Sequence, residues 1–112
     1  MTMQKLTQLI WLKKEIELDE RRLRMLEAQE NRGDPELTAL AAAVREKREL
    51  CRREQVALEQ YILQIDDSFT RQLFVYRYMY GMNWVQVAFA VGGGNTPDAV
   101  KKRCQRWVWA HP

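Results

Sequence analysis

The chain has 112 residues and a mass of 13.3 kDa, with 29% charged and 46% apolar residues. This is the size of one small domain, too short for most multi-domain enzymes. Its apolar runs are far shorter than the ~20 residues that span a bilayer, and its start lacks a secretory layout. The only histidine is His111, which leaves little material for a His-based triad or zinc site. We therefore predict a cytoplasmic protein that is not an enzyme and has no cofactor, metal or membrane span.

Charge and aromatic residues divide the chain in two. Residues 1–65 carry twelve basic and twelve acidic side chains, and residues 66–112 carry six basic and three acidic ones, so the net charge of +3 lies entirely in the second part. Nine of the eleven aromatic residues lie there too. We predict a domain at each of these ranges. Cys51 and Cys104 have no second pair beside them and are predicted to be free, reduced thiols of an intracellular protein rather than a disulfide.

The first domain is predicted to be an antiparallel, coiled-coil-like helical hairpin. Residues 2–32 contain no Gly or Pro and are rich in good helix formers. A stop follows at residues 31–35, where Gly33 suits a helix C-cap, Asp34 can cap the next helix and Pro35 fits its first position. The second helix is expected to run to about Ile65. Both helices carry apolar residues at 3-4 spacing, at Leu9, Leu12, Ile16, Leu23 and Leu26 and then at Leu37, Leu40, Val44, Cys51, Leu58, Tyr61 and Ile65.

The position of the turn predicts the register of the hairpin. If the turn centres near Gly33, residues whose numbers sum to about 66 face each other. Asp19 and Lys47, which interrupt the two stripes, should then form an ion pair that fixes register with little net stabilisation. The apolar pairs expected from the same rule are Leu26 with Leu40, Leu23 with Val44, Ile16 with Cys51, and Leu9 with Leu58.

The sequence allows two interpretations of the hairpin's function. One apolar stripe per helix buries little apolar surface within the hairpin. This favours a spacer or an oligomerisation arm that forms a homodimer or binds another protein. The alternative is a solvated hairpin that only stabilises the second domain. The basic residues between 45 and 53 alternate with acidic ones, as is typical of a solvated helix face.

The second domain is predicted to contain three helices. The first follows the start signal at residues 66–68, runs from Phe69 to Tyr80 and should be the central one. A short helix over residues 84–91 follows the N-cap Asn83. Its alternating Val85, Val87, Phe89 and Val91 also fit a strand, but a lone strand would leave its backbone unpaired. The glycines at 92–94 end this helix.

The last helix has the clearest signals. Thr96 is a good N-cap and Pro97 is favoured at the first position, and the helix should run to about Trp109. Its buried stripe is expected at Val100, Cys104, Trp107 and Val108. A short helix, a Gly-rich turn and a longer helix with a basic outer face indicate a helix-turn-helix whose second helix lies in the major groove. The predicted DNA-binding residues are at the start and on the outer face of this helix: Thr96, Pro97, Asp98, Ala99, Lys101, Lys102, Gln105 and Arg106.

Residues 58–109 resemble the promoter −35-reading C-terminal domain, region 4, of bacterial sigma factors. The resemblance lies in residues 73–88 (LFVYRYMYGMNWVQVA), in Val91-Gly92 and in residues 100–103 (VKKR). It implies a fold of the helix-turn-helix type, with groove-reading positions at Pro97, Asp98, Lys101, Lys102 and Gln105. The turn at 92–96 is about two residues longer than usual, and Phe89 replaces a usually polar residue, which suggests contact with the hairpin or a partner.

Nothing in the chain resembles the part of a sigma factor that melts the −10 element. The sequence is instead similar to small prophage-type sigma-like regulators, which join a helical N-terminus to a unit like region 4. We therefore expect a nucleoid-associated transcriptional regulator that binds double-stranded DNA and also contacts RNA polymerase. The alternative is a protein–protein adaptor that binds RNA polymerase or a sigma or anti-sigma partner without reading DNA.

Overall fold

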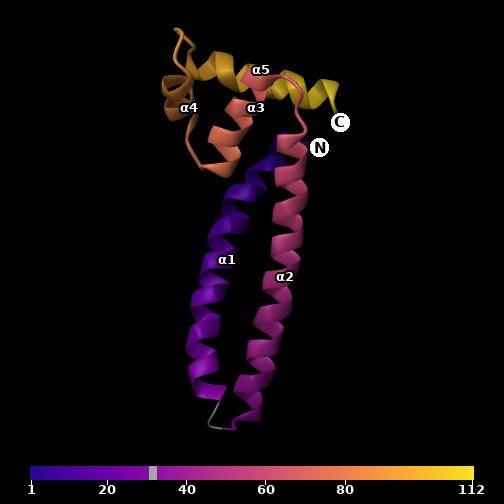
Figure 1. Ribbon diagram of the computed structural model, residues 1–112, viewed down its shortest axis with the longest axis vertical. Helices are drawn as coiled ribbons and strands as arrows, with labels where there is room; N and C mark the ends of the chain where they lie inside the picture. The colour runs from indigo at the N-terminus through magenta and orange to yellow at the C-terminus, as the bar shows by residue number, and fades with distance from the viewer. Residues whose placement is uncertain (31–32) are drawn as a thin grey trace. The chain divides into compact units, whose positions relative to one another are not determined.

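The computed structural model describes residues 1–30 and 33–112, and all regular secondary structure in these residues is helical (Figure 1). The predicted all-α class is confirmed. In chain order the elements are α1 (Met3–Glu30), α2 (Pro35–Leu63), α3 (Ser68–Phe74), a π-helical segment η1 (Val75–Met79), α4 (Trp84–Val91) and α5 (Pro97–Ala110). None of the described helices is both long enough and apolar enough to cross a bilayer.

The chain forms two compact units. Residues 11–56 make up one, called here the two-helix unit, and residues 1–10 and 57–112 make up the other, called here the terminal unit. The long helices α1 and α2 each contribute to both. The domain division predicted at residue 65 rests on charge and aromatic content, and it stays a prediction.

In the two-helix unit, α1 and α2 run side by side in opposite directions (Figure 1). The predicted ion pair is confirmed: Lys47 Nζ lies 2.9 Å from Asp19 Oδ1, and Glu15 Oε1 lies 3.4 Å from the same ammonium. The hydrogen bond to Asp19 raises the pKa of Lys47. Asp19 is buried, whereas Lys47 is half exposed. The ammonium group of this partly exposed lysine therefore neutralises a carboxylate buried between α1 and α2.

The buried stripe of α2 differs from the prediction at two places: Ala41 is buried where Leu40 was expected, and Ile62 is buried where Tyr61 was expected. Leu23 and Leu26 pack with Ala41 and Val44, whereas Leu40 is 38% exposed. The predicted pairing of Leu26 with Leu40 is therefore wrong. The residue that precedes Val44 on the buried stripe is Ala41, three positions back, and not Leu40, four positions back.

The start of α2 follows the predicted cap chemistry. Gly33 has a φ of +73°, the left-handed region in which glycine is favoured. Asp34 Oδ1 accepts a hydrogen bond of 2.9 Å from the Glu36 amide, and the helix begins at Pro35. The rest of the predicted stop, Asn31 and Arg32, lies outside the described residues.

The core of the terminal unit draws on both ends of the chain. Tyr78 is fully buried, and its hydroxyl donates to Met3 Sδ at 3.6 Å. Tyr78 also packs against Phe74 and edge-on against Trp84. The buried apolar residues of this unit are Leu6, Leu9, Leu58, Ile62, Ile65, Leu73, Phe74, Tyr78, Val87, Ala88, Val100, Cys104 and Val108.

The predicted helix over residues 69–80 ends in a π-helical turn. The Tyr80 amide donates to the Val75 carbonyl at 3.0 Å, a five-residue step, and the Met82 amide donates to the Tyr76 carbonyl. The wider turn leaves Tyr78 in the core and Tyr80 exposed.

The short helix α4 has the predicted bounds and the predicted cap. Asn83 Oδ1 accepts from the Gln86 amide, and Gln86 Oε1 accepts from the Asn83 amide, each at 2.9 Å. This reciprocal capping box satisfies two backbone donors that a helix start leaves unpaired. The helical interpretation of residues 84–91 is thus confirmed over the strand pattern.

Candidate nucleic-acid interface

Cap chemistry fixes the start of α5. Thr96 is extended, its Oγ1 accepts from the Ala99 amide at 3.1 Å, and Pro97 occupies the first helical position. Before it, Gly92, Gly93 and Gly94 all have φ between +64° and +74°. Asn95 Nδ2 closes this turn by donating to the Gly92 carbonyl at 2.7 Å. The first turn of α5 is therefore capped by side-chain hydrogen bonds and exposed.

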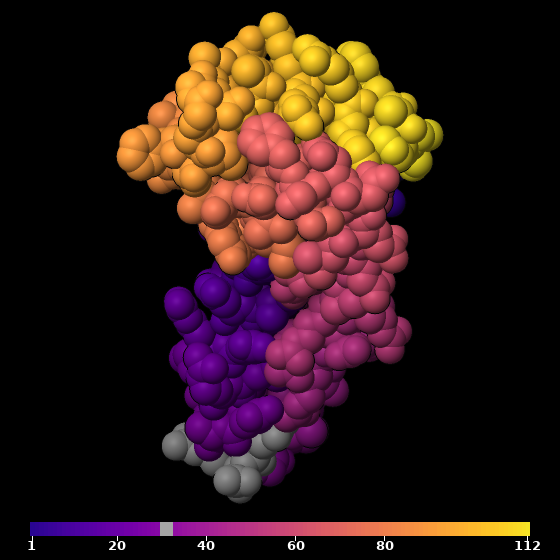
Figure 2. Space-filling view, turned by 45° about the horizontal axis from the view of Figure 1, so that its top comes forward, coloured from indigo at the N-terminus to yellow at the C-terminus, as the bar shows by residue number. Residues whose placement is uncertain are grey.

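The packed side of α5 is formed by Val100, Cys104 and Val108, all buried as predicted. Burial raises the pKa of the Cys104 thiol to about 12, so it is a neutral core group. The predicted interface residues lie on the remaining surface, exposed except for half-buried Gln105: Thr96, Pro97, Asp98, Ala99, Lys101, Lys102, Gln105 and Arg106. In the space-filling view, the turn and α5, coloured orange to yellow, form a continuous surface (Figure 2).

Trp107 differs from its predicted place in the core. It is half-buried, and its ring stacks on His111 with centroids 3.7 Å apart. Residue 107 lies at the edge of the stripe that Cys104 and Val108 define, so only part of the indole is covered. Trp109 is exposed.

Three of the six basic residues after position 65 serve the fold. Arg71 Nη1 donates to the Ile65 carbonyl at 2.7 Å. Arg77 Nη1 donates to the Met82 carbonyl at 2.8 Å, and its guanidinium lies over the Tyr78 and Trp84 rings. These two arginines hold the ends of the segment between α2 and α4.

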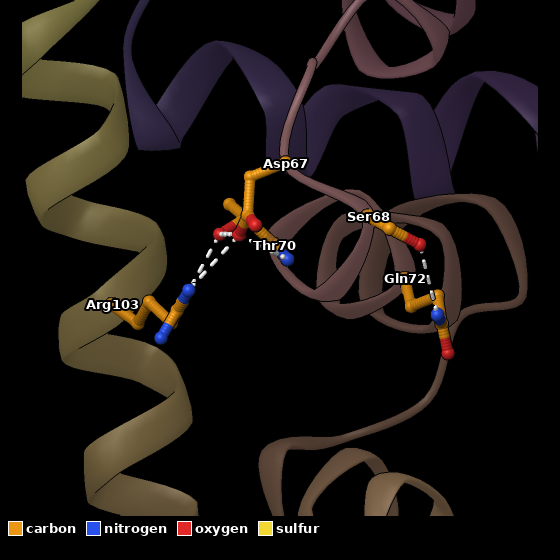
Figure 3. Close-up of polar contacts among 5 residues, drawn as sticks. All are labelled: Asp67, Ser68, Thr70, Gln72 and Arg103. Carbon is orange, nitrogen blue, oxygen red and sulfur yellow. Dashed lines mark hydrogen bonds and ion pairs between the residues drawn. The ribbon is translucent and has the colours of Figure 1, made fainter.

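Arg103 is the third structural arginine, and it joins α5 to α3 (Figure 3). Its Nη2 lies 2.9 Å from Asp67 Oδ2, and its Nε donates to Thr70 Oγ1 at 3.0 Å. The guanidinium also lies 4.6 Å from the centre of the Phe69 ring. Hydrogen bonds from Thr70 and then from Arg103 lower the pKa of Asp67 to about 2. Sequence reasoning found Asp67 as part of a helix start but missed its partner.

The remaining basic residues all lie on the outer side of α5. Lys101, Lys102 and Arg106 are exposed. Lys102 Nζ forms a 2.9 Å ion pair with Asp98 one turn earlier, whereas Lys101 and Arg106 make no ion pair within residues 1–30 and 33–112. Because the other basic side chains of this part are used internally, its positive charge is concentrated on one helix.

An apolar surface lies on the neighbouring helix. Phe89 is 89% exposed, and Val85, one turn before it, is also exposed. The other side of α4 packs Val87 and Ala88 into the core. Over the described residues, no group of three or more His, Cys, Asp or Glu side chains is placed to hold a metal ion.

No protein-family model, curated protein or solved structure matches the chain.

Proposed function

We propose that the protein is a DNA-binding transcriptional regulator of the phage or prophage type, which reads the major groove with residues 97–109 of α5. The observation that carries the proposal is the concentration of exposed positive charge on α5, at Lys101, Lys102 and Arg106. In this proposal α4, the glycine turn and α5 are a helix-turn-helix, and the unit as a whole is like sigma region 4.

The shape and chemistry of α5 suit a major groove. An α-helix fits the width of this groove, and the N-terminal residues of a recognition helix meet the base edges. Thr96, Pro97 and Ala99 are small and exposed at this end, so they permit close approach. Ala99 would contact a thymine methyl, and Lys101 and Gln105 would donate to purine acceptors.

Asp98 and Lys102 form an ion pair in the free protein, and in the proposal both exchange this partner for DNA groups on binding. On DNA, Lys102 would leave Asp98 for a phosphate or a guanine, and the freed Asp98 would accept from a cytosine amino group. Arg106, farther along the helix, would neutralise a phosphate. Each phosphate contact made in this way releases counterions and makes affinity depend on salt.

The long helices α1 and α2 are proposed to form an antiparallel hairpin that acts as a spacer or oligomerisation arm. A regulator of this kind would act at the nucleoid in the cytoplasm and would contact RNA polymerase at the promoter. It would need no metal, cofactor or catalytic residue.

A second candidate function is supported by the exposed apolar side of α4. Phe89 and Val85 give up hydrophobic stabilisation by remaining in water, as expected of a protein-binding surface. In this alternative the chain is an adaptor that binds RNA polymerase or a sigma or anti-sigma partner without reading DNA.

One pair of assays separates the two functions. The purified chain is tested for binding to random duplex DNA at low salt and for co-purification with RNA polymerase, with Phe89→Asp as the variant. A DNA-binding regulator retains duplex affinity when Phe89 is replaced. Co-purification that Phe89→Asp abolishes, without any duplex binding by the wild type, selects the adaptor.

A further inference from the structure

The two flanks of the two-helix unit have different chemistry. On one flank, Arg45 pairs with Glu27 at 3.2 Å and Arg52 pairs with Glu20 at 2.5 Å. Both the acids and the bases are seven residues apart, so the pairs recur once per two turns along the same side of the seam. Ion pairs of this kind are typical of a flank that faces water.

The opposite flank carries apolar residues that are largely exposed. Trp11, Leu18 and Met25 recur every seven residues on α1 and are 60%, 61% and 68% exposed. Leu18 and Met25 line a groove of about 770 Å³ together with Leu40 and Lys47 of α2. Leu50, exposed and three residues after Lys47, extends the same face of α2. These residues, Trp11, Leu18, Met25, Leu40 and Leu50, are called here the apolar flank.

We propose that the apolar flank is the contact surface for a second copy of this chain, packed antiparallel about a two-fold axis at Leu18. The proposal does not depend on DNA binding by α5. In this register Leu18 meets the partner's Leu18, and Trp11 meets the partner's Met25, a pairing of sulfur with an aromatic ring that is favourable. Trp11 and Met25 each lie seven residues from Leu18, so the contact at Leu18 and the contact between Trp11 and the partner's Met25 form in the same register.

Charge complementarity favours a second copy in this orientation. Glu15 precedes Leu18 by three residues and Arg22 follows it by four, so both lie beside it on the helix surface. An antiparallel copy centred on Leu18 brings Glu15 next to the partner's Arg22, and it does so twice by symmetry. A parallel copy would place like charges together. Arg22 forms no ion pair with any residue that the structure describes, whereas Glu15 lies 3.4 Å from Lys47 of its own chain and would be shared between that lysine and the partner's Arg22.

Leu18→Glu tests whether the flank associates. The mass in solution is measured by light scattering and sedimentation at several concentrations of the full chain. We expect the wild type to have twice the 13.3 kDa of one chain and Leu18→Glu, which places two carboxylates at the axis, to be monomeric with unchanged helix content. Glu17→Arg, an exposed change one residue away that lies off the flank, should stay dimeric. A monomeric wild type, or a dimeric Leu18→Glu, overturns the proposal.

A charge swap tests the register. Glu15→Arg and Arg22→Glu each create two like-charge contacts in a homodimer, so each should weaken association at least about tenfold. Mixing the two variants restores both opposite-charge contacts and should restore the dimer to near wild-type affinity. Circular dichroism of each variant alone shows whether it is folded. A mixture that associates no better than its components overturns the antiparallel register.

Discussion

Asp67 and Arg103, 36 residues apart in the chain, form a 2.9 Å ion pair that joins the N-cap of α3 to the middle of α5 (Figure 3). The same carboxylate caps α3 by accepting from the Thr70 amide at 3.0 Å. One side chain therefore begins a helix and also holds the proposed DNA-binding helix against it. The placement of α5 depends on this contact as well as on its buried stripe.

This contact should make stability depend on pH in the acid range. The pKa of Asp67 is lowered from its ordinary 3.8 to about 2 by Thr70 and Arg103. A lowered pKa stabilises the fold above the unfolded value, and the stabilisation is lost as pH falls through the folded value. Between about pH 4 and pH 2, the thermal midpoint of the wild type should fall more steeply than that of Asp67→Asn. Asp66→Asn, the neighbouring control, should follow the wild type, and equal slopes for wild type and Asp67→Asn would contradict this role.

Asp98→Asn should strengthen non-specific DNA binding. The substitution releases Lys102 from its 2.9 Å ion pair and removes a negative charge from the proposed interface. Lys102 leaves Asp98 in the proposed wild-type complex too, so affinity should rise while the slope of log affinity against log salt changes by less than about 0.9, the value for one phosphate contact. Loss of a favourable charge at the helix start should lower stability by about 0.5 kcal/mol. Fluorescence anisotropy with duplex DNA measures the slope, with Asp66→Asn as the charge-matched control; weaker binding by Asp98→Asn alone would be the contrary result.

Replacing Asp19 and replacing Lys47, the two members of the ion pair in the two-helix unit, should change the free energy of unfolding by different amounts. Lys47→Ala leaves the Asp19 carboxylate buried without its cation and should cost about 1–3 kcal/mol. Asp19→Leu removes the buried charge and continues the apolar stripe of α1, so it should be neutral or stabilising. Urea unfolding gives both free energies. If Asp19→Leu is the more destabilising of the two, the ion pair contributes net stability and this expectation is wrong.

Arg77→Ala should lower stability without lowering DNA affinity. Its guanidinium bonds the Met82 carbonyl and lies 5.2 Å from the centre of the Trp84 ring, contacts together worth about 2 kcal/mol. Arg77→Lys keeps the charge but not the planar fork, so it should recover only part of the loss. Thermal unfolding and duplex titration of the folded variants are the measurements. If Arg77→Ala lowers DNA affinity without lowering the unfolding temperature, Arg77 belongs to the DNA interface and this expectation is wrong.

Helix bounds were predictable where local chemistry decides them. Asn83 and Thr96 cap α4 and α5, and Pro35 begins α2, because hydroxyl, amide and proline groups satisfy or remove unpaired donors within a few residues. The ion pair of Asp19 and Lys47 was predictable because two charges interrupt two stripes at matching distances from one turn. The exposed face of α5 followed from the same periodicity.

Other features depend on the tertiary structure and were missed. The burial of Ala41 in place of Leu40 depends on how the two helices pack against each other. The π-helical turn at Val75–Met79 has no local composition signal. The contact of Met3 with Tyr78 joins segments at opposite ends of the chain. The contacts of Arg103 with Asp67 and Thr70 join residues more than thirty positions apart, so no local pattern indicates them.

The salt dependence of duplex binding tests most directly whether α5 binds DNA. Anisotropy titrations at several salt concentrations compare the wild type with Lys101→Ala/Lys102→Ala and with Lys5→Ala/Arg24→Ala, which removes two exposed charges from α1. We predict that the α5 variant binds more weakly and that its salt slope is smaller by up to about one phosphate contact, that of Lys102, while the α1 variant stays close to the wild type. Wild-type affinity and slope in the α5 variant, or the same loss in both variants, would contradict DNA binding by α5.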